Sequence, residues 1–315
     1  MKLELYYLFN VCIKYVCSFN IDVENIISFK GDNGTMFGYT AVLLSNDDGN
    51  WVVVGAPKAR FLDRPEIKTP GNIYKCKVNF TRFQQENCLP ISIRTEEDTR
   101  WPDLPGYEED NQLLGAAMAH LNNKIVICAP LWKNMIPLRD ENITHPIGRC
   151  HNLDKTLITF STDKFSKSRL PASSDMPSHQ FAEAGFSISS KEMQTNDAHS
   201  VLLGAPGFFS GKGGFLTYTH ERVNNFFKSY THMNINSYLK NSILPSSLMG
   251  YSIATGYISF IYNCPNVVVL GAPHLYTNIG AVLVVCLASN NNVEVKKQVF
   301  GKKVRNTVLN KYRQI

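Results

Sequence analysis

The sequence predicts an all-β protein built from repeated four-stranded sheets, and three observations support this. Four times, a glycine beside an aromatic or small residue is followed by an apolar run that ends in Gly-Ala-Pro or a near variant. The prolines that end these runs, Pro57, Pro130, Pro206 and Pro273, lie 73, 76 and 67 positions apart. No segment holds a sustained apolar period of 3.6 residues, which argues against stacked helices.

Each unit contains the same parts in the same order. The glycine motifs are Phe37-Gly38-Tyr39, Leu114-Gly115-Ala116, Ala184-Gly185-Phe186 and Met249-Gly250-Tyr251. A second glycine, followed by another β-rich run, comes after each proline, at Gly71, Gly148, Gly214 and Gly280. One unit therefore corresponds to about four short strands joined by turns. The runs before the prolines are apolar without alternation, as in strands covered on both faces, and proline ends the strand because it lacks an N–H. A four-stranded sheet repeated in this way predicts the blades of a β-propeller.

Composition places the chain among globular proteins. It has 315 residues, of which 44% are hydrophobic and 18% are charged, with a formal net charge of +6. Much of the excess positive charge follows Val295, at Lys296, Lys297, Lys302, Lys303, Arg305, Lys311 and Arg313. Such a basic segment suits either a nucleic-acid or membrane surface or a solvated chain end. Because no platform of stacking aromatics accompanies it, we do not expect nucleic-acid binding.

Residues 1–18 resemble a secretory signal peptide. Lys2 supplies a positive start, an apolar stretch follows, and Val16 and Ser18 are small enough to precede cleavage before Phe19. Asn10 and Lys14 interrupt the apolar stretch, so a buried N-terminal strand is the alternative. No later stretch approaches the ~18 apolar residues that span a bilayer, so we expect no membrane span within this chain.

Sequons and cysteines also fit an exported protein. The three N-glycosylation sequons begin at Asn33, Asn79 and Asn142. Six of the eight cysteines lie beyond the signal segment, at Cys76, Cys88, Cys128, Cys150, Cys264 and Cys286. Sequence alone leaves their connectivity open. A metal site is not favoured, because no cysteine or histidine pair has zinc-finger spacing. We expect Cys264 and Cys286, which lie in or beside apolar strands, to be buried thiols.

Motifs for catalysis are not found in the sequence. It contains neither Gly-x-Ser-x-Gly nor His-Glu-x-x-His. Gly211-Lys212-Gly213 lacks the earlier glycine and the Ser or Thr of a phosphate-binding loop. His151 with Asp154, or His199 with Asp197, could form a dyad, but ordinary polar residues are the simpler interpretation. The acidic runs Glu96–Asp98 and Glu108–Asp110 are likewise expected to be solvated rather than to bind a cation. We therefore predict no enzyme activity and no metal site.

The repeated motifs resemble the FG-GAP repeats of integrin α subunits. Phe19-Asn20-Ile21-Asp22 resembles the start of a mature integrin α chain, and Ile127–Trp132 with Pro146–Cys150 resembles its second blade. Ala184–Ser187 and Leu202–Gly207 resemble the third blade. The resemblance implies seven blades, of which residues 19–295 would supply about four. It leaves residues 296–315 as a basic tail or, at Val299-Phe300-Gly301, the start of a fifth blade.

The resemblance also implies partners and site residues. It pairs Cys76 with Cys88 and Cys128 with Cys150, and it places calcium loops only in later blades, because Gly256–Tyr262 has no carboxylate. It implies a cell-surface heterodimer in which a basic side chain of an integrin β subunit enters an aromatic cage. The matching residues are Tyr39, Phe186 and Tyr251. These aromatics could instead simply pack between blades.

For an extracellular-matrix ligand, the resemblance indicates the loops of blades two to four. The candidates are Asp175, Phe208 and Phe209. Without paired carboxylates to hold an arginine, Arg-Gly-Asp recognition is not expected. Two other functions fit an FG-GAP repeat. One is a secreted, lectin-like or scaffold propeller without a β partner, although the blade loops here are dissimilar. The other is a propeller attached to a phospholipase, which would need a separate catalytic domain rich in His and Asp.

Overall fold

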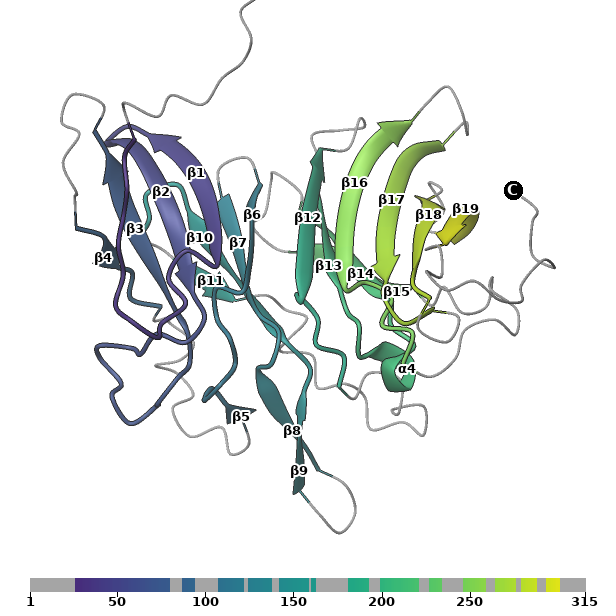
Figure 1. Cartoon of the computed structure of the whole chain (residues 1–315), viewed down its shortest axis with the longest axis horizontal. Helices are drawn as coiled ribbons and strands as arrows, with labels where there is room; N and C mark the ends of the chain where they lie inside the picture. The colour runs from purple at the N-terminus through teal and green to yellow at the C-terminus, as the bar shows by residue number, and fades with distance from the viewer. Residues whose placement is uncertain are drawn as a thin grey trace, which may run out of the picture.

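The computed structural model describes residues 26–79, 87–93, 107–121, 124–137, 142–158, 160–162, 181–192, 199–220, 227–233, 246–258, 264–275, 279–287 and 293–300. Within these ranges the chain forms four four-stranded antiparallel sheets and one three-stranded sheet (Figure 1). The prediction of an all-β propeller-type fold is confirmed. The expected signal peptide, Phe19–Asp22 and Asp175 lie outside the described residues.

Blades 1 and 2 are the first two four-stranded sheets. Blade 1 consists of β1 (Thr40–Asn46), β2 (Gly49–Ala56), β3 (Asn72–Val78) and β4 (Leu89–Pro90). Blade 2 consists of β6 (Ala117–Leu121), β7 (Lys124–Ala129), β10 (Arg149–Asp154) and β11 (Phe160–Thr162). In each blade the neighbouring strands follow one another as an antiparallel meander, apart from an insertion between β7 and β10.

Blades 3 and 4 are uninterrupted meanders. Blade 3 consists of β12 (Ser187–Glu192), β13 (His199–Gly204), β14 (Phe215–His220) and β15 (Phe227–Met233). Blade 4 consists of β16 (Ser252–Ile258), β17 (Cys264–Ala272), β18 (Ala281–Leu287) and β19 (Val293–Phe300). The first strands of successive blades contact one another, β1 with β6, β6 with β12 and β12 with β16, so the blades follow in chain order across Figure 1.

The apolar run before each proline forms the second strand of a blade, and its alternate side chains face the two neighbouring blades. In β7, Ile125 and Ile127 pack in the layer between blades 1 and 2. Val126 and Cys128, one position along, pack in the layer between blades 2 and 3. Because successive strand residues point to opposite faces, a strand buried on both sides must be apolar throughout. Each such side chain contributes roughly 1.5–3 kcal/mol by leaving water.

The layer between blades 3 and 4 is built by the same rule. Leu202 of β13 and Phe215 of β14 pack against Leu270 and Leu283 of blade 4. Val201 and Leu203 instead face blade 2, together with Leu216. The three apolar layers explain why the repeat is periodic: a single sheet cannot cover its own two faces.

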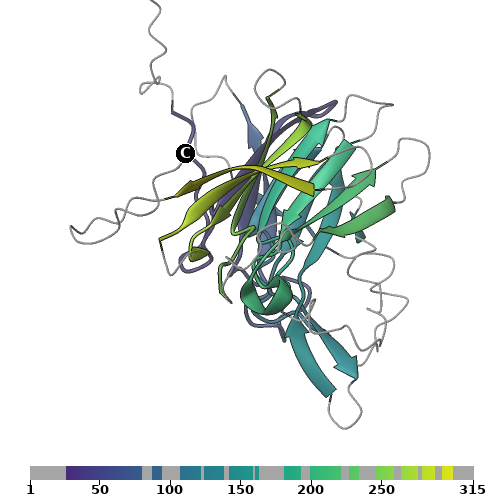
Figure 2. The ribbon, with the colours of Figure 1, turned by 90° about the vertical axis from the view of Figure 1, so that its right-hand side faces the viewer.

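An inserted hairpin interrupts blade 2. Between β7 and β10 the chain forms β8 (Lys133–Pro137) and β9 (Asn142–Pro146), and β5 (Tyr107–Glu108) pairs with β8. This hairpin lies between Cys128 and Cys150 in the sequence and extends away from the sheets (Figures 1 and 2).

The C-terminal end of the described chain differs from the sequence prediction. The strand β19 ends at Phe300, past the expected boundary at residue 295, so residues 296–300 belong to the fourth strand of blade 4. Val299 and Phe300 pair with Val282 and Ala281 of β18. Gly301, the next residue of the motif that was expected to begin a fifth blade, lies outside the described residues. Among the described residues, no helix has the length and apolar character needed to cross a membrane.

Candidate binding face

Four equivalent turns place the motif residues at the start of the first strand of each blade. In each turn, the residue two before the glycine has positive φ: Met36, Leu113, Glu183 and Leu248. The motif glycines Gly38, Gly115, Gly185 and Gly250 have φ of 88°, 84°, 87° and 83°. In each turn, the N–H of the residue after the glycine donates a hydrogen bond to the carbonyl of the residue two before the glycine, as Tyr39 does to Met36. Glycine suits this position because it adopts positive φ without steric cost.

The turns bring two of the three predicted cage aromatics together. The rings of Phe186 and Tyr251 lie 4.7 Å apart between centroids and are tilted by 45°. Tyr251 is 48% exposed and Phe186 is partly buried. Tyr39, which is 56% exposed, makes no ring contact with them in the described part of the chain. The equivalent residue of blade 2 is Ala116, so the aromatic series is interrupted between blades 1 and 3.

The two candidate ligand aromatics of blade 3 have different environments. Both belong to the short element α4 (Phe208–Gly211), whose Phe209 and Ser210 have left-handed φ and ψ. Phe208 is 2% exposed and packs in the layer between blades 2 and 3. Burial excludes Phe208 from direct ligand contact and leaves Phe209, which is partly buried, as the accessible member of the pair. The preceding Gly207 is required because a Cβ there would overlap the carbonyl oxygen of Phe181.

A buried histidine lies where the inserted hairpin meets the start of blade 3. His145 of β9 is 5% exposed, and its ring packs edge-on against Phe181 with centroids 4.6 Å apart. Neither ring nitrogen has a hydrogen-bond partner in the described structure. Burial lowers the pKa of His145, because the imidazolium is desolvated. The nearby Glu183, whose N–H donates to the carbonyl of Pro146, has its pKa raised by burial.

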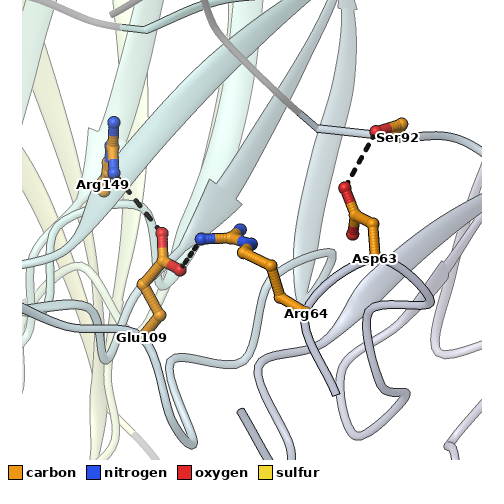
Figure 3. Close-up of polar contacts among 5 residues, drawn as sticks. All are labelled: Asp63, Arg64, Ser92, Glu109 and Arg149. Atoms are coloured by element: carbon orange, nitrogen blue, oxygen red, sulfur yellow. Dashed lines mark hydrogen bonds and ion pairs between the residues drawn. The ribbon is translucent and has the colours of Figure 1, made fainter. Parts of the chain in front are cut away.

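A charged cluster brings together Arg64 from the loop between β2 and β3, Glu109 directly after β5, and Arg149 of β10 (Figure 3). Glu109 accepts from Arg64 Nη1 at 2.5 Å and lies 3.8 Å from Arg149 Nη1. The side chains of Glu109 and Arg149 are 7% and 10% exposed. The guanidinium of Arg149 also lies over the ring of Trp132, at 5.2 Å from its centroid. Glu109 is therefore not the solvated acid that the sequence indicated, but a buried carboxylate that accepts a hydrogen bond from Arg64 and forms an ion pair with Arg149.

The other residues of this acidic segment have ordinary structural partners. Glu108 forms an exposed ion pair with Lys133, and Asp110 accepts from the N–H and the hydroxyl of Thr69. These hydrogen bonds from Thr69 lower the pKa of Asp110. Among the described residues, no group of three His, Cys, Asp or Glu could hold a metal ion. Asp197 and the run Glu96–Asp98 lie outside those residues.

Two disulfides have the pairing that the resemblance implied. Cys76 bonds Cys88 in blade 1, and Cys128 bonds Cys150 in blade 2. Cys286 is disulfide-bonded as well, so the expectation of a free thiol there is wrong. An apolar setting alone cannot distinguish a thiol from a half-cystine, because both are well accommodated in a core. Of the sequon residues, Asn33 is exposed and Asn79 is half-buried, while the side chain of Asn142 lies outside the described residues.

Comparison with known proteins adds an independent observation. The chain is 29% identical over 272 residues to integrin alpha-4 of Xenopus laevis, and 27% identical over 282 residues to integrin alpha-8 of Homo sapiens. It is 25% identical over 249 residues to integrin alpha-V of Gallus gallus. These alignments cover 84%, 85% and 77% of this chain but 24%, 25% and 22% of the relatives. The chain thus spans about a quarter of the length of these relatives.

The remaining comparisons add little. No protein-family model matches the chain. A family 43 arabinoxylan arabinofuranohydrolase from Bacillus subtilis superposes with a TM-score of 0.37 at 9% identity, over 84% of this chain and 50% of that one, which is too weak to support a fold or a function. The similarity to integrin α subunits at 25–29% identity, taken with the four motif turns and the two disulfides, supports an integrin α FG-GAP region.

Proposed function

We propose that the chain is part of the extracellular head of an adhesion-receptor α subunit and that it pairs with an integrin β subunit. The observation that carries this proposal is the set of equivalent turns, which present Tyr39, Phe186 and Tyr251 at the same position of their blades. Exposed aromatic rings beside one another suit a desolvated cation. Each cation–π contact of this kind contributes about 0.5–2 kcal/mol.

Within this role, Phe186 and Tyr251 are the central pair. Their rings are in contact, so a cationic side chain reaching one ring also meets the other. Tyr39 takes a secondary position, since Ala116 separates it from that pair around the arc of blades. The proposed interface therefore concentrates on blades 3 and 4.

We also propose that the chain contributes to binding an extracellular-matrix ligand. The surface for it combines Phe209 of α4 with Phe181, which is 51% exposed and caps His145. Asp175 would add a carboxylate from the neighbouring segment. With one candidate acid, the proposed ligand contacts are mainly apolar rather than a bidentate arginine pair.

Association with a β subunit can be measured directly. The full chain would be secreted together with an integrin β-subunit ectodomain, and its apparent affinity determined by titration. We expect Phe186→Ala combined with Tyr251→Ala to weaken association at least about fivefold. The control is Ile158→Ala, which trims an exposed apolar side chain of blade 2 that is 73% exposed and lies away from the motif turns.

The outcomes separate two parts of the proposal. If the double variant binds like the parent chain, the aromatic pair has no role in pairing. If the parent chain itself does not associate with any β ectodomain, the heterodimer proposal is wrong.

A further inference from the structure

The register of blade 3 brings two histidines and a glutamate into one row across the sheet. Glu192 of β12 pairs with His199 of β13, and His199 pairs with His220 of β14. Residues that pair directly on neighbouring antiparallel strands lie on the same face of the sheet, with Cβ atoms about 4.5–5.5 Å apart. His199 therefore occupies the middle of a row that holds one carboxylic acid and two imidazoles.

The row lies at the end of blade 3 that is opposite the motif turns. Glu192 is the last residue of β12, His199 the first of β13 and His220 the last of β14. On the same face of these strands, closer to the motif turns, Leu203 pairs with Leu216, and both pack in the layer between blades 2 and 3. The row thus marks the outer limit of that apolar layer.

A hydrogen bond between blades shows what lies beside the row. Ser190 is two residues before Glu192 on the same face of β12. Its Oγ donates a hydrogen bond of 2.7 Å to the carbonyl of His120 in β6. The row therefore lies beside the last residues of β6, at the margin of blade 2.

The backbone of the three strands carries this placement. The side chains of Glu192, His199 and His220 lie outside the described part of the structure, so the finding that no described group could hold a metal ion does not extend to them. In the sequence His199 lies near Asp197, but the register gives it Glu192 and His220 as its neighbours in the sheet. Spacing along the chain did not indicate this row, because its members come from three different strands.

The blade repeat does not require these residues. The corresponding row of blade 1 holds Ser45, Asn50 and Val78. Among the strand pairings that the structure describes, blade 3 alone combines two histidines and a carboxylate in one row. The combination is therefore a property of blade 3 and not of the fold.

This set of residues suits a divalent transition metal ion. Imidazole nitrogens and carboxylate oxygens are both ligands of zinc, at about 2.0–2.2 Å from the ion. Two histidines and one glutamate, with water in the fourth position, are a sufficient set for a tetrahedral zinc ion. Calcium is a poor match, because it takes oxygen ligands and six to eight of them.

We propose that Glu192, His199 and His220 form a binding site for a divalent transition metal ion of the zinc type. The bound ion ties together the ends of β12, β13 and β14 and so stabilises the end of blade 3. The proposed site lies at the opposite end of the blade from Phe186, so it is independent of β-subunit pairing.

Zinc binding to the full chain can be measured by calorimetry. The chain is secreted without a histidine tag, dialysed free of metal and titrated with zinc chloride near neutral pH. We expect one zinc ion per chain and a higher melting temperature in zinc, because an ion that binds the folded state stabilises it. The affinity for zinc should fall below pH ~6.5, where protons compete for the imidazoles. Calcium at the same concentration should not change the melting temperature.

Three substitutions test the ligands one at a time. His199→Gln, His220→Gln and Glu192→Gln should each weaken the affinity for zinc at least about tenfold, since loss of a second-shell partner alone costs 10–100-fold. The matched control is His120→Ala, which removes an exposed histidine of β6 and keeps the carbonyl that Ser190 uses. Without zinc, each variant should melt at the temperature of the parent chain, which shows that its fold is intact.

The outcomes decide the assignment. A parent chain that binds no zinc would overturn the inference. Affinity that His199→Gln or His220→Gln leaves unchanged would do so as well, and so would an equal loss in His120→Ala. An unchanged affinity in Glu192→Gln alone would overturn the role of the carboxylate, and an ion pair with a lysine such as Lys124 of β7 would then be the simpler use of Glu192.

Discussion

The ring of His145 lies edge-on to the ring of Phe181, with centroids 4.6 Å apart, and joins the inserted hairpin of blade 2 to the entry of blade 3. The imidazole is buried, and neither of its nitrogens has a partner among the described residues. Its neutral form is therefore the one that the folded chain accommodates.

This burial predicts a loss of stability in mild acid. The folded-state pKa of His145 is lowered, so below pH ~6.5 the unfolded chain binds a proton that the folded chain resists. The free energy of unfolding should fall as pH decreases from about 6.5 towards the folded-state pKa. His145→Phe should reduce this slope in urea titrations between about pH 7.5 and 5. Burial raises the pKa of Glu183, so above its unfolded-state pKa this residue makes the free energy of unfolding fall as pH rises, the opposite sense to His145. Glu183 is present in both the parent chain and His145→Phe, so the difference between their two slopes is due to His145. Equal slopes would contradict the prediction.

The charged cluster predicts that replacing Glu109 lowers the free energy of unfolding far more than replacing the adjacent Glu108. Glu109→Gln leaves Arg64 and Arg149 without their shared carboxylate, and breaking a buried ion pair costs about 3–5 kcal/mol. Glu108→Gln is the matched control, because its pair with Lys133 is exposed and such pairs contribute about 0–1 kcal/mol. Urea unfolding of both variants gives the comparison. Similar small losses in the two would show that the cluster is not a stabilising contact.

The two disulfides should also differ in how much they stabilise the folded chain. Their loops span 12 and 22 residues, which on the chain-entropy model corresponds to about 3 kcal/mol each. Replacing Cys128 and Cys150 together with alanine should cost more than replacing Cys76 and Cys88, because the first pair also fills the space beside Gly185. Thermal unfolding of the two double variants tests this order. A larger loss for the Cys76–Cys88 pair would contradict it.

Gly207 offers a test of the blade 3 loop. Gly207→Ala should destabilise the chain by about 1–3 kcal/mol, because the new Cβ overlaps the Phe181 carbonyl oxygen and the loop must shift. Gly256→Ala is the control, since its Cβ would meet nothing within 4 Å. Thermal unfolding should be affected only by the first change. Equal melting temperatures for the two variants would mean that the loop at Gly207 can shift to accept the Cβ at little cost in stability.

We propose that the described blades require no calcium, as the sequence between Gly256 and Tyr262 lacks carboxylates. Addition of EDTA to the purified chain, dialysed free of zinc, should then leave the melting temperature unchanged. A fall in melting temperature on chelation, reversed by added calcium, would refute this proposal.

Local chemistry made the second strand of each blade predictable. Apolar runs that end in proline, such as Trp51–Pro57, combine high strand propensity with a definite stop. The small inserted sheet was missed because β8 and β9 are short and carry mixed polar and apolar residues, as the segments Lys133–Pro137 and Asn142–Pro146 show.

Contacts between distant residues could not be obtained from the sequence. Glu109 stands in a run of acids that suggests a solvated loop, yet its partner Arg64 lies 45 positions earlier. The motif position of Phe208 suggested a ligand contact, whereas burial of its ring is decided by packing between blades 2 and 3. The interruption of the aromatic series at Ala116 was visible in the sequence, but its consequence for Tyr39 required the order of the blades in space.

In blades 1 and 3, a glycine of the second strand pairs with a hydroxyl-bearing residue of the first strand. In blade 2 the same two positions hold Cys128 and Ala117, and this difference fixes the order of the blades. A chimera that substituted a copy of the first repeat for the second would place a hydroxyl and an empty space beside Gly185. In the natural order, the sulfurs of Cys128 and Cys150 fill that space. The repeats are therefore not interchangeable modules, and shuffling them should fail even though each carries the same motifs. Any duplication or recombination of these segments would have to move the cysteine pair and its neighbour as one inherited unit.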